Sequence, residues 1–153
     1  MDLQEVMSTD TIHLSMQVEN KQQAIEELTM LLEKKGFISN KEQFIKDIYA
    51  REAQGKTGIG DGIAIPHGKS ESVIKNAIAI GRVPGEIEWE TLDDKPVRVI
   101  MLFAVRKADA SSVHIKMLAQ VAGALADEHV CERLLHSEYP QEIINVFQKE
   151  HQS

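Results

Sequence analysis

The sequence has few of the features that mark secreted or membrane proteins. Its 153 residues include one cysteine, Cys131, which excludes an intrachain disulfide and favours a reducing compartment. No apolar run approaches the roughly 20 residues that a membrane helix needs. The N-terminal segment MDLQEVMSTD is acidic and lacks the apolar stretch of a secretory signal. We therefore expect a cytoplasmic protein without membrane insertion.

Basic charge is scarce as well. The chain carries 17 Lys and Arg against 24 Asp and Glu, a formal net charge of −7, and no cluster of basic residues stands out. Binding to nucleic acid usually needs a basic face, so we expect no nucleic-acid partner. An acidic surface suits a basic protein partner, or it serves solubility alone.

Apolar spacing predicts three longer helices and two shorter ones. Residues 20–36 and 40–55 each begin at an asparagine that can cap a helix and end at a glycine. A third helix is expected at about 112–126, with an apolar stripe along one side. Short helices near 128–136 and 140–149 end the chain.

Four runs have the character of strands, at 11–16, 63–65, 77–83 and 97–105. The last, VRVIMLFAV, is almost wholly apolar and is typical of a central strand covered on both faces. Pro84–Gly85 and Asp93–Asp94 read as turns. No repeat or linker divides the chain. The sequence therefore predicts one α/β domain over 1–153, with three layers: a mixed sheet of about five strands flanked by helices on both faces.

The segment GIGDGIAIPHGKS, residues 58–70, raises the question of chemistry. Pro66 fixes a backbone torsion before His67, and Gly68 lets another molecule approach the backbone closely. The pattern predicts an exposed imidazole on a rigid mount, with open space in front of it.

A nucleotide-binding loop is the first interpretation to test against this segment. Such a loop needs G-x-x-x-x-G-K-[ST], and the position five residues before Gly68 is Ile63. Gly62 lies one residue too far away. Pro66 also removes an N–H from a loop that would have to surround phosphates with N–H groups. The spacing argues against a P-loop.

A nucleophilic histidine is the second interpretation. A neutral imidazole can attack a phosphoryl group and form a covalent phosphohistidine. Transfer of this kind needs donors that stabilise the equatorial oxygens. Arg51 and His114 are candidates, Arg51 as a guanidinium and His114 in the first turn of the third helix, where Ser111 or Ser112 would be the cap. From spacing alone, Arg51 can equally be a solvated helix residue.

The remaining histidines and the cysteine carry weaker signals. Ordinary surface or core positions suit His13, His129, His136 and His151. No His/Cys spacing typical of a zinc site occurs, so no metal is expected. Cys131 lies within a predicted helix, and a buried structural thiol suits it better than a reactive one.

The string REAQGKTGIGDGIAIPHGKS, residues 51–70, closely resembles the signature of enzyme IIA components of the bacterial sugar phosphotransferase system, fructose/mannitol class. The resemblance continues through IEWETLDDKPVRVIMLFAVRKADASSVHIKMLAQVAGALAD and spans essentially the whole chain. The family fold is a mixed five-stranded sheet with helices on both faces. The resemblance implies no metal and no organic cofactor.

The resemblance also implies roles for particular residues. His67 would accept a phosphoryl group from the carrier HPr, on Nε2, and pass it to a cysteine of a cognate enzyme IIB during sugar uptake. His114 matches the family's second active-site histidine and Arg51 its arginine. Thr57 matches a position that lines the site, and Gly68 would border the phosphate or partner. The chain would then be a phosphotransferase component with a covalent phosphohistidine.

Two further functions stay open at this point. A nitrogen-related enzyme IIA shares the P-H-G-K segment and acts as a regulator whose phosphorylation state controls protein partners. A sensing domain of a transcriptional regulator would need an attached DNA-binding module, and none fits within these 153 residues.

Overall fold

The computed structural model describes residues 3–110 and 112–152, with side chains described up to residue 148. Its elements, in chain order, are η1 (Leu3–Glu5), β1 (Met7–His13), α1 (Lys21–Lys34), α2 (Lys41–Glu52), β2 (Gly58–Gly60), β3 (Ile63–Ala64), β4 (His67–Ser70), β5 (Ala77–Ile87), β6 (Val97–Arg106), η2 (Lys107–Asp109), α3 (Val113–Leu125), α4 (Glu128–His136) and α5 (Pro140–Gln152). None of the helices in these described residues is long and apolar enough to cross a membrane.

The sheet is mixed and has six strands in the order β1-β5-β6-β3-β2, with β4 also paired to β6. Strand β6 is antiparallel to β5 and parallel to both β3 and β4. This confirms the interpretation of VRVIMLFAV as a central strand. The two short strands β2 and β4 were not predicted, because runs of three and four residues are too short to show an alternating pattern.

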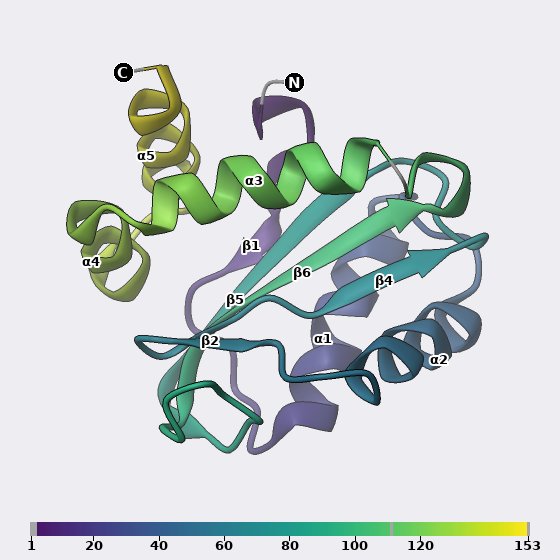
Figure 1. Cartoon of the computed structure of the whole chain (residues 1–153), viewed down its shortest axis with the longest axis horizontal. Helices are drawn as coiled ribbons and strands as arrows, with labels where there is room; N and C mark the ends of the chain where they lie inside the picture. Colours follow the sequence, from purple (N-terminus) through teal and green to yellow (C-terminus); the bar gives the residue numbers. More distant parts are fainter. Residues whose placement is uncertain (1–2, 111, 153) are drawn as a thin grey trace.

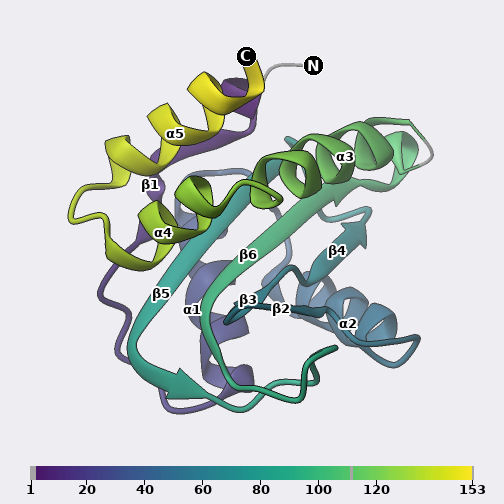
Figure 2. The same ribbon diagram turned by 60° about the vertical axis from the view of Figure 1, so that its left-hand side comes forward.

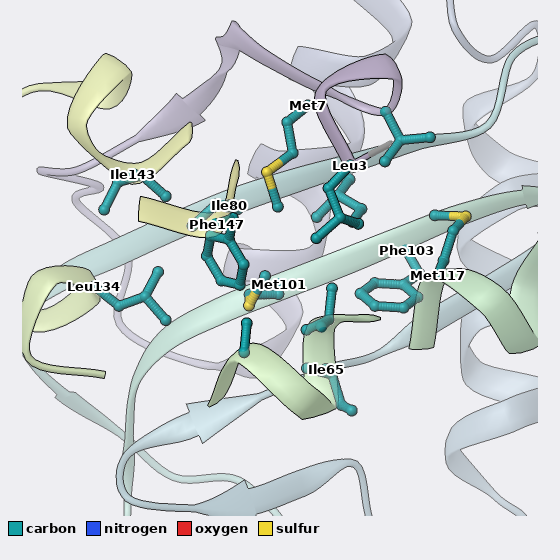
Figure 3. Close-up of a cluster of buried hydrophobic side chains, with 14 of the residues drawn as sticks. Leu3, Met7, Ile65, Ile80, Met101, Phe103, Met117, Leu134, Ile143 and Phe147 are labelled. Atoms are coloured by element: carbon teal, nitrogen blue, oxygen red, sulfur yellow. The ribbon is translucent and has the colours of Figure 1, made fainter. Parts of the chain in front are cut away.

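Helices cover both faces of this sheet, as predicted (Figures 1 and 2). Helices α1 and α2 pack on one face, in a core that includes Phe44 and Ile48. Helices α3, α4 and α5 pack on the other, in a core that includes Phe103 and Met117 (Figure 3). Strand β6 supplies both cores, since its side chains alternate between the two faces.

The first two helices begin where the sequence predicts. Asn20 and Asn40 have extended backbone, and their side chains accept hydrogen bonds from Gln23 N and Gln43 N. Helix α1 is followed by Gly36 in the left-handed region, at φ 84°. Helix α2 ends at Glu52, before the predicted stop at Gly55, which leaves Arg51 in its last turn.

One predicted turn is wrong. Pro84–Gly85 lies inside β5, because that strand bulges: Arg82 pairs with Val99 and Ile87 with Val97, so β5 has more residues than β6 between the two pairs. A bulge leaves residues outside the ladder, and proline is tolerated there. The other predicted turn, Asp93–Asp94, is confirmed.

Candidate active site

Strand pairing holds the backbone that carries His67. Strand β4 runs parallel to β6 with His67 opposite Phe103, and the carbonyl of Pro66 accepts a hydrogen bond of 2.9 Å from Phe103 N. Proline cannot rotate about φ, so the backbone that enters β4 is fixed from two sides. These contacts agree with the predicted rigid attachment of His67, which stays a prediction.

Gly68 faces the opposite way, toward α2. A Cβ added to Gly68 would lie 2.4 Å from Phe44 Cε1 and 3.1 Å from Ile48 Cγ1, far inside normal contact. The absence of a side chain therefore lets α2 pack directly on β4. Close approach does explain this glycine, as the sequence suggests, but the approaching group is Phe44 of the same chain. A role for Gly68 toward a phosphate or partner stays a prediction.

The chain brings His67 and His114 together, although they are far apart in sequence. His114 is in the first turn of α3, and its ring centroid lies 4.8 Å from that of His67 with the planes at 69°. The Phe103 ring packs edge-on against both, at centroid distances of 5.1 Å and 6.5 Å. Ser112 is the N-cap residue but makes no side-chain cap bond; the alternative cap, Ser111, lies outside the described residues.

The prediction of an exposed His67 is wrong. Its residue exposure is 4%, and both ring nitrogens are buried without a hydrogen-bond partner among the described residues. His114 is 8% exposed, and its Nε2 is also buried without a hydrogen-bond partner among the described residues. The ring lies against Phe103 of β6 and against His114, in the first turn of α3. A local sequence pattern does not report how a helix far along the chain will cover it.

Burial and positive neighbours keep both imidazoles uncharged. Burial is the largest influence on His67, and together with His114, Arg51 and Lys69 it lowers the pKa to about 3. Burial also lowers the pKa of His114, with the charges of Lys69 and Arg51 acting in the same direction. At pH 7 each ring is therefore neutral and keeps one nitrogen lone pair.

Arg51 lies close enough for its charge to act on both rings. Its Nη1 donates a hydrogen bond of 3.3 Å to the carbonyl of Gly55, which holds the guanidinium over the loop after α2. The guanidinium has several other N–H groups available for an anion. The site thus combines two buried neutral imidazoles with a cation nearby, an arrangement that can accept an electrophile and stabilise negative charge beside it.

Thr57 belongs to a neighbouring feature. Its hydroxyl accepts a hydrogen bond of 2.9 Å from Trp89 Nε1, and Trp89 lines a cleft of about 1000 Å³ between the start of α1 and the segment 86–96. One of the lysines that line the cleft, Lys21, pairs with Glu52 and Glu90 and lies over the Trp89 ring. The His67 site, whose ring nitrogens have no hydrogen-bond partner among the described residues, is the better candidate for chemistry. The assignment of Thr57 to the lining of the His67 site stays a prediction.

The weaker candidates take ordinary positions where the structure describes them. The Gly68–Ser70 triplet is extended in β4 and has no P-loop geometry. Cys131 Sγ lies 3.2 Å from the carbonyl of Leu125, and burial raises the pKa of the thiol. Among the described residues, no group of three or more His, Cys, Asp and Glu side chains could hold a metal. The side chain of His151 lies outside the described residues.

Two residues near the site were not singled out from the sequence. Phe103 is one apolar residue in a wholly apolar strand, and nothing in the pattern distinguishes it. In the sequence, Lys69 stands out only as part of the P-H-G-K segment and of the triplet that resembles a P-loop. Its spacing from His67 is the signal that could have found it, since alternate residues of a strand point to one face.

Residues 5–150 match the family described as phosphoenolpyruvate-dependent sugar phosphotransferase system, EIIA 2. The chain belongs to this EIIA 2 family. The match includes all of the site residues discussed above, and it confirms the resemblance drawn from residues 51–70.

Relatives of two kinds are similar to this EIIA 2 chain. A Bacillus subtilis protein named PTS system fructose-specific EIIABC component is 34% identical over 95% of the chain and 23% of its own length, so the chain spans about a quarter of that relative. A Klebsiella oxytoca protein named nitrogen regulatory protein is 31% identical over 95% of the chain and 90% of its own length.

A solved structure confirms the fold. The nitrogen regulatory protein IIA-Ntr from Neisseria meningitidis superposes with a TM-score of 0.85 at 29% identity, covering 94% of this chain and 97% of that one. The mixed sheet with helices on both faces is therefore the fold of a solved relative. Names of sugar components and of nitrogen regulators both occur among the relatives.

Proposed function

We propose that the chain is a phosphoryl carrier of sugar uptake in which His67 is the acceptor. One lone pair of the neutral imidazole attacks the phosphorus of a phosphohistidine on HPr and forms a new N–P bond. The N–P bond of the donor breaks, and its electron pair returns to the donor ring nitrogen. The group then moves in the same manner to a cysteine thiolate of an enzyme IIB, with His67 as the leaving imidazole.

One observation carries the proposal: the close pairing of His67 with His114, with both rings neutral and with unpartnered nitrogens. Buried polar atoms are nearly always hydrogen-bonded, so three unpartnered ring nitrogens in one place are typical of a site kept free for chemistry. Arg51 adds a guanidinium, which suits phosphoryl oxygens. His114 would act mainly by position, since a helix N-terminus contributes only about 0.3–1 kcal/mol when exposed.

The burial of the His67 ring counts against the proposal in its simplest form, because a donor has to reach one ring nitrogen. Two rings lie against the His67 ring: Phe103 on the central strand β6 and His114 in the first turn of α3. The proposal therefore requires that this turn shifts when a partner docks, while β4 stays fixed between β6 and α2. Motions of this kind occur on microsecond to millisecond timescales and are compatible with transfer.

Labelling tests the proposal directly. The protein is incubated with radiolabelled phosphoenolpyruvate, enzyme I and HPr, and acid-labile label on the chain is measured. We expect stoichiometric label on the wild type and none on His67→Ala. The matched control is His129→Ala, which removes an exposed histidine from α4 and should be labelled like the wild type. An unlabelled wild type, or equal label on His67→Ala, would refute the acceptor role.

The second candidate function is a regulator of the nitrogen-related class. The specific observation in its favour is the similarity to solved and curated nitrogen regulatory proteins. Such a protein takes label in the same assay but transfers it to no IIB. Transfer of label from the phosphorylated chain to a candidate IIB therefore separates the functions: transfer supports sugar uptake, and retention of label with every candidate supports regulation.

A further inference from the structure

Lys69 shares a strand face with His67. In the parallel pairing of β4 with β6, His67 lies opposite Phe103 and Lys69 opposite Val105. Side chains alternate along a strand, so His67 and Lys69 point to the side that carries α3, while Gly68 points to α2. Residues two apart in a strand are about 6.6 Å apart, a span that a lysine side chain can bridge.

The charge of Lys69 is unmatched. Its residue is exposed, and its side chain has no ion pair or hydrogen bond among the described residues. Other lysines differ: Lys35 pairs with Asp10, and Lys107 with Glu71. Several other lysines, Lys34 among them, also lack an ion pair among the described residues, so what distinguishes Lys69 is its place two residues from His67 on the same strand face.

The positive charge of Lys69 lowers the pKa of both imidazoles. After burial, Lys69 is the largest influence that lowers the pKa of His114, ahead of Arg51, and it acts on His67 in the same direction. The ammonium group therefore lies within electrostatic reach of the space between the two rings. A phosphoryl group on His67 would bring a dianion into that space.

We propose that Lys69 is a phosphoryl-binding residue, whose ammonium group attracts the incoming phosphoryl group and stabilises its charge on His67. The proposal rests on the function proposed above. A lysine suits this place because its compact charge on a flexible stem can follow the group as it moves between partners. Lys69 forms no covalent bond and acts through charge and hydrogen bonds to phosphoryl oxygens.

The rate of transfer from phosphorylated HPr tests this role. We compare wild type with Lys69→Gln and Lys69→Arg in single-turnover reactions at low and high salt. The matched control is Lys34→Gln, which removes an exposed lysine of α1, on the opposite layer. At low salt we expect Lys69→Gln to be about tenfold slower, with a smaller difference at high salt, and Lys69→Arg and Lys34→Gln to lie within about twofold of wild type.

A second measurement does not depend on phosphoryl transfer. The pKa of His114 is followed by NMR in the unphosphorylated proteins, which also shows that each variant is folded. Loss of a nearby positive charge should raise this pKa in Lys69→Gln and leave it unchanged in Lys69→Arg and Lys34→Gln. No change in Lys69→Gln would place the ammonium group too far away and would overturn the proposal.

The outcomes distinguish this inference from the function on which it rests. An unlabelled wild type refutes the proposed function, and the role of Lys69 with it. A labelled wild type with an equally fast Lys69→Gln refutes the role of Lys69 alone. Equal slowing in Lys69→Gln and Lys69→Arg would indicate a packing role and would also overturn the proposal. A wild-type rate in Lys69→Arg, together with a salt-dependent decrease of the transfer rate in Lys69→Gln, supports it.

Discussion

The two faces of strand β4 differ in how completely their groups are satisfied. On the α2 face, Gly68 is in tight contact with Phe44 and Ile48, with no room for one added carbon. On the α3 face, His67 contacts His114, and its two buried ring nitrogens have no hydrogen-bond partner among the residues that the structure describes. One strand of four residues thus carries a closed packing surface and an unsatisfied polar site.

This difference shows how the fold holds a reactive group. Leaving a buried polar atom unpaired costs about 1–3 kcal/mol, so the α3 face destabilises the folded state. Packing on the α2 face and pairing to β6 offset that cost and fix the backbone of β4. The position of the His67 ring then depends on packing at the α2 face of β4, while its reactivity depends on the unpartnered nitrogens at the α3 face.

The largest effect is expected from filling the closed face. Gly68→Ala introduces a carbon 2.4 Å from Phe44 Cε1, and we expect it to lower the free energy of unfolding by about 2–3 kcal/mol in urea denaturation. Gly85→Ala is the control, because a Cβ there meets nothing within 4 Å.

A double-mutant cycle identifies the contact responsible. Phe44→Leu makes space beside position 68, so Gly68→Ala should cost less in that background than in wild type. If the two changes are simply additive, the proposed tight contact between α2 and β4 is not what excludes a side chain.

Acid should destabilise the folded protein through His67, on the α3 face of β4. The unfolded chain binds a proton on His67 near pH 6.5 and the folded chain only near pH 3, so stability is full above pH 6.5 and falls as the pH drops toward 3. The contribution reaches at most about 1.4 kcal/mol per pH unit, or about 2 kcal/mol between pH 6.5 and 5. His114 acts in the same direction, since burial lowers its pKa as well.

Unfolding curves at several pH values check this expectation. His67→Asn should show a shallower loss of stability between pH 6.5 and 5 than wild type, and His129→Asn, an exposed control, should match wild type. Parallel curves for wild type and His67→Asn would show that the ring is not held neutral by its surroundings.

A smaller effect is expected from His114→Gln. Glutamine keeps a hydrogen-bonding side chain but removes the ring that lies 4.8 Å from His67, so we expect labelling of His67 from HPr to slow about tenfold. Initial rates of label incorporation measure this change. An unaltered rate would separate His114 from the reaction and leave it a packing residue.

The smallest effect should come from α3, away from the site. Gly123 lies inside this helix with nothing within 4 Å of an added Cβ, so Gly123→Ala should raise the free energy of unfolding by about 0.5–1 kcal/mol. Thermal unfolding shows the gain, and labelling of His67 should be unchanged. Lost labelling in this variant would contradict the view that only the first turn of α3 has to move.

Local signals predicted much of this fold. The asparagine caps and the periodic apolar residues located the helices, and the apolar run at residues 97–105 identified the central strand. The short strand β4 and the bulge at Pro84–Gly85 could not be predicted, because both depend on pairing with β6 rather than on their own residues.

The sequence predicted which residues form the candidate site better than it predicted how they are buried and packed. The sequence pattern and the family resemblance both pointed to His67, His114 and Arg51, and the structure brings the two histidines into contact. The burial of His67 depends on where α3 lies, and the need for Gly68 depends on Phe44 in another helix. Such facts arise from distant packing, which a local motif does not contain.

The contact between the two imidazoles also links protons to any anion that the site receives. Burial keeps both rings neutral, and a positive charge on His114, 4.8 Å away, would further lower the pKa of His67. A dianion attached to His67 would reverse that preference and draw a proton to His114. By thermodynamic reciprocity, a proton on His114 would in turn favour the presence of the anion beside it.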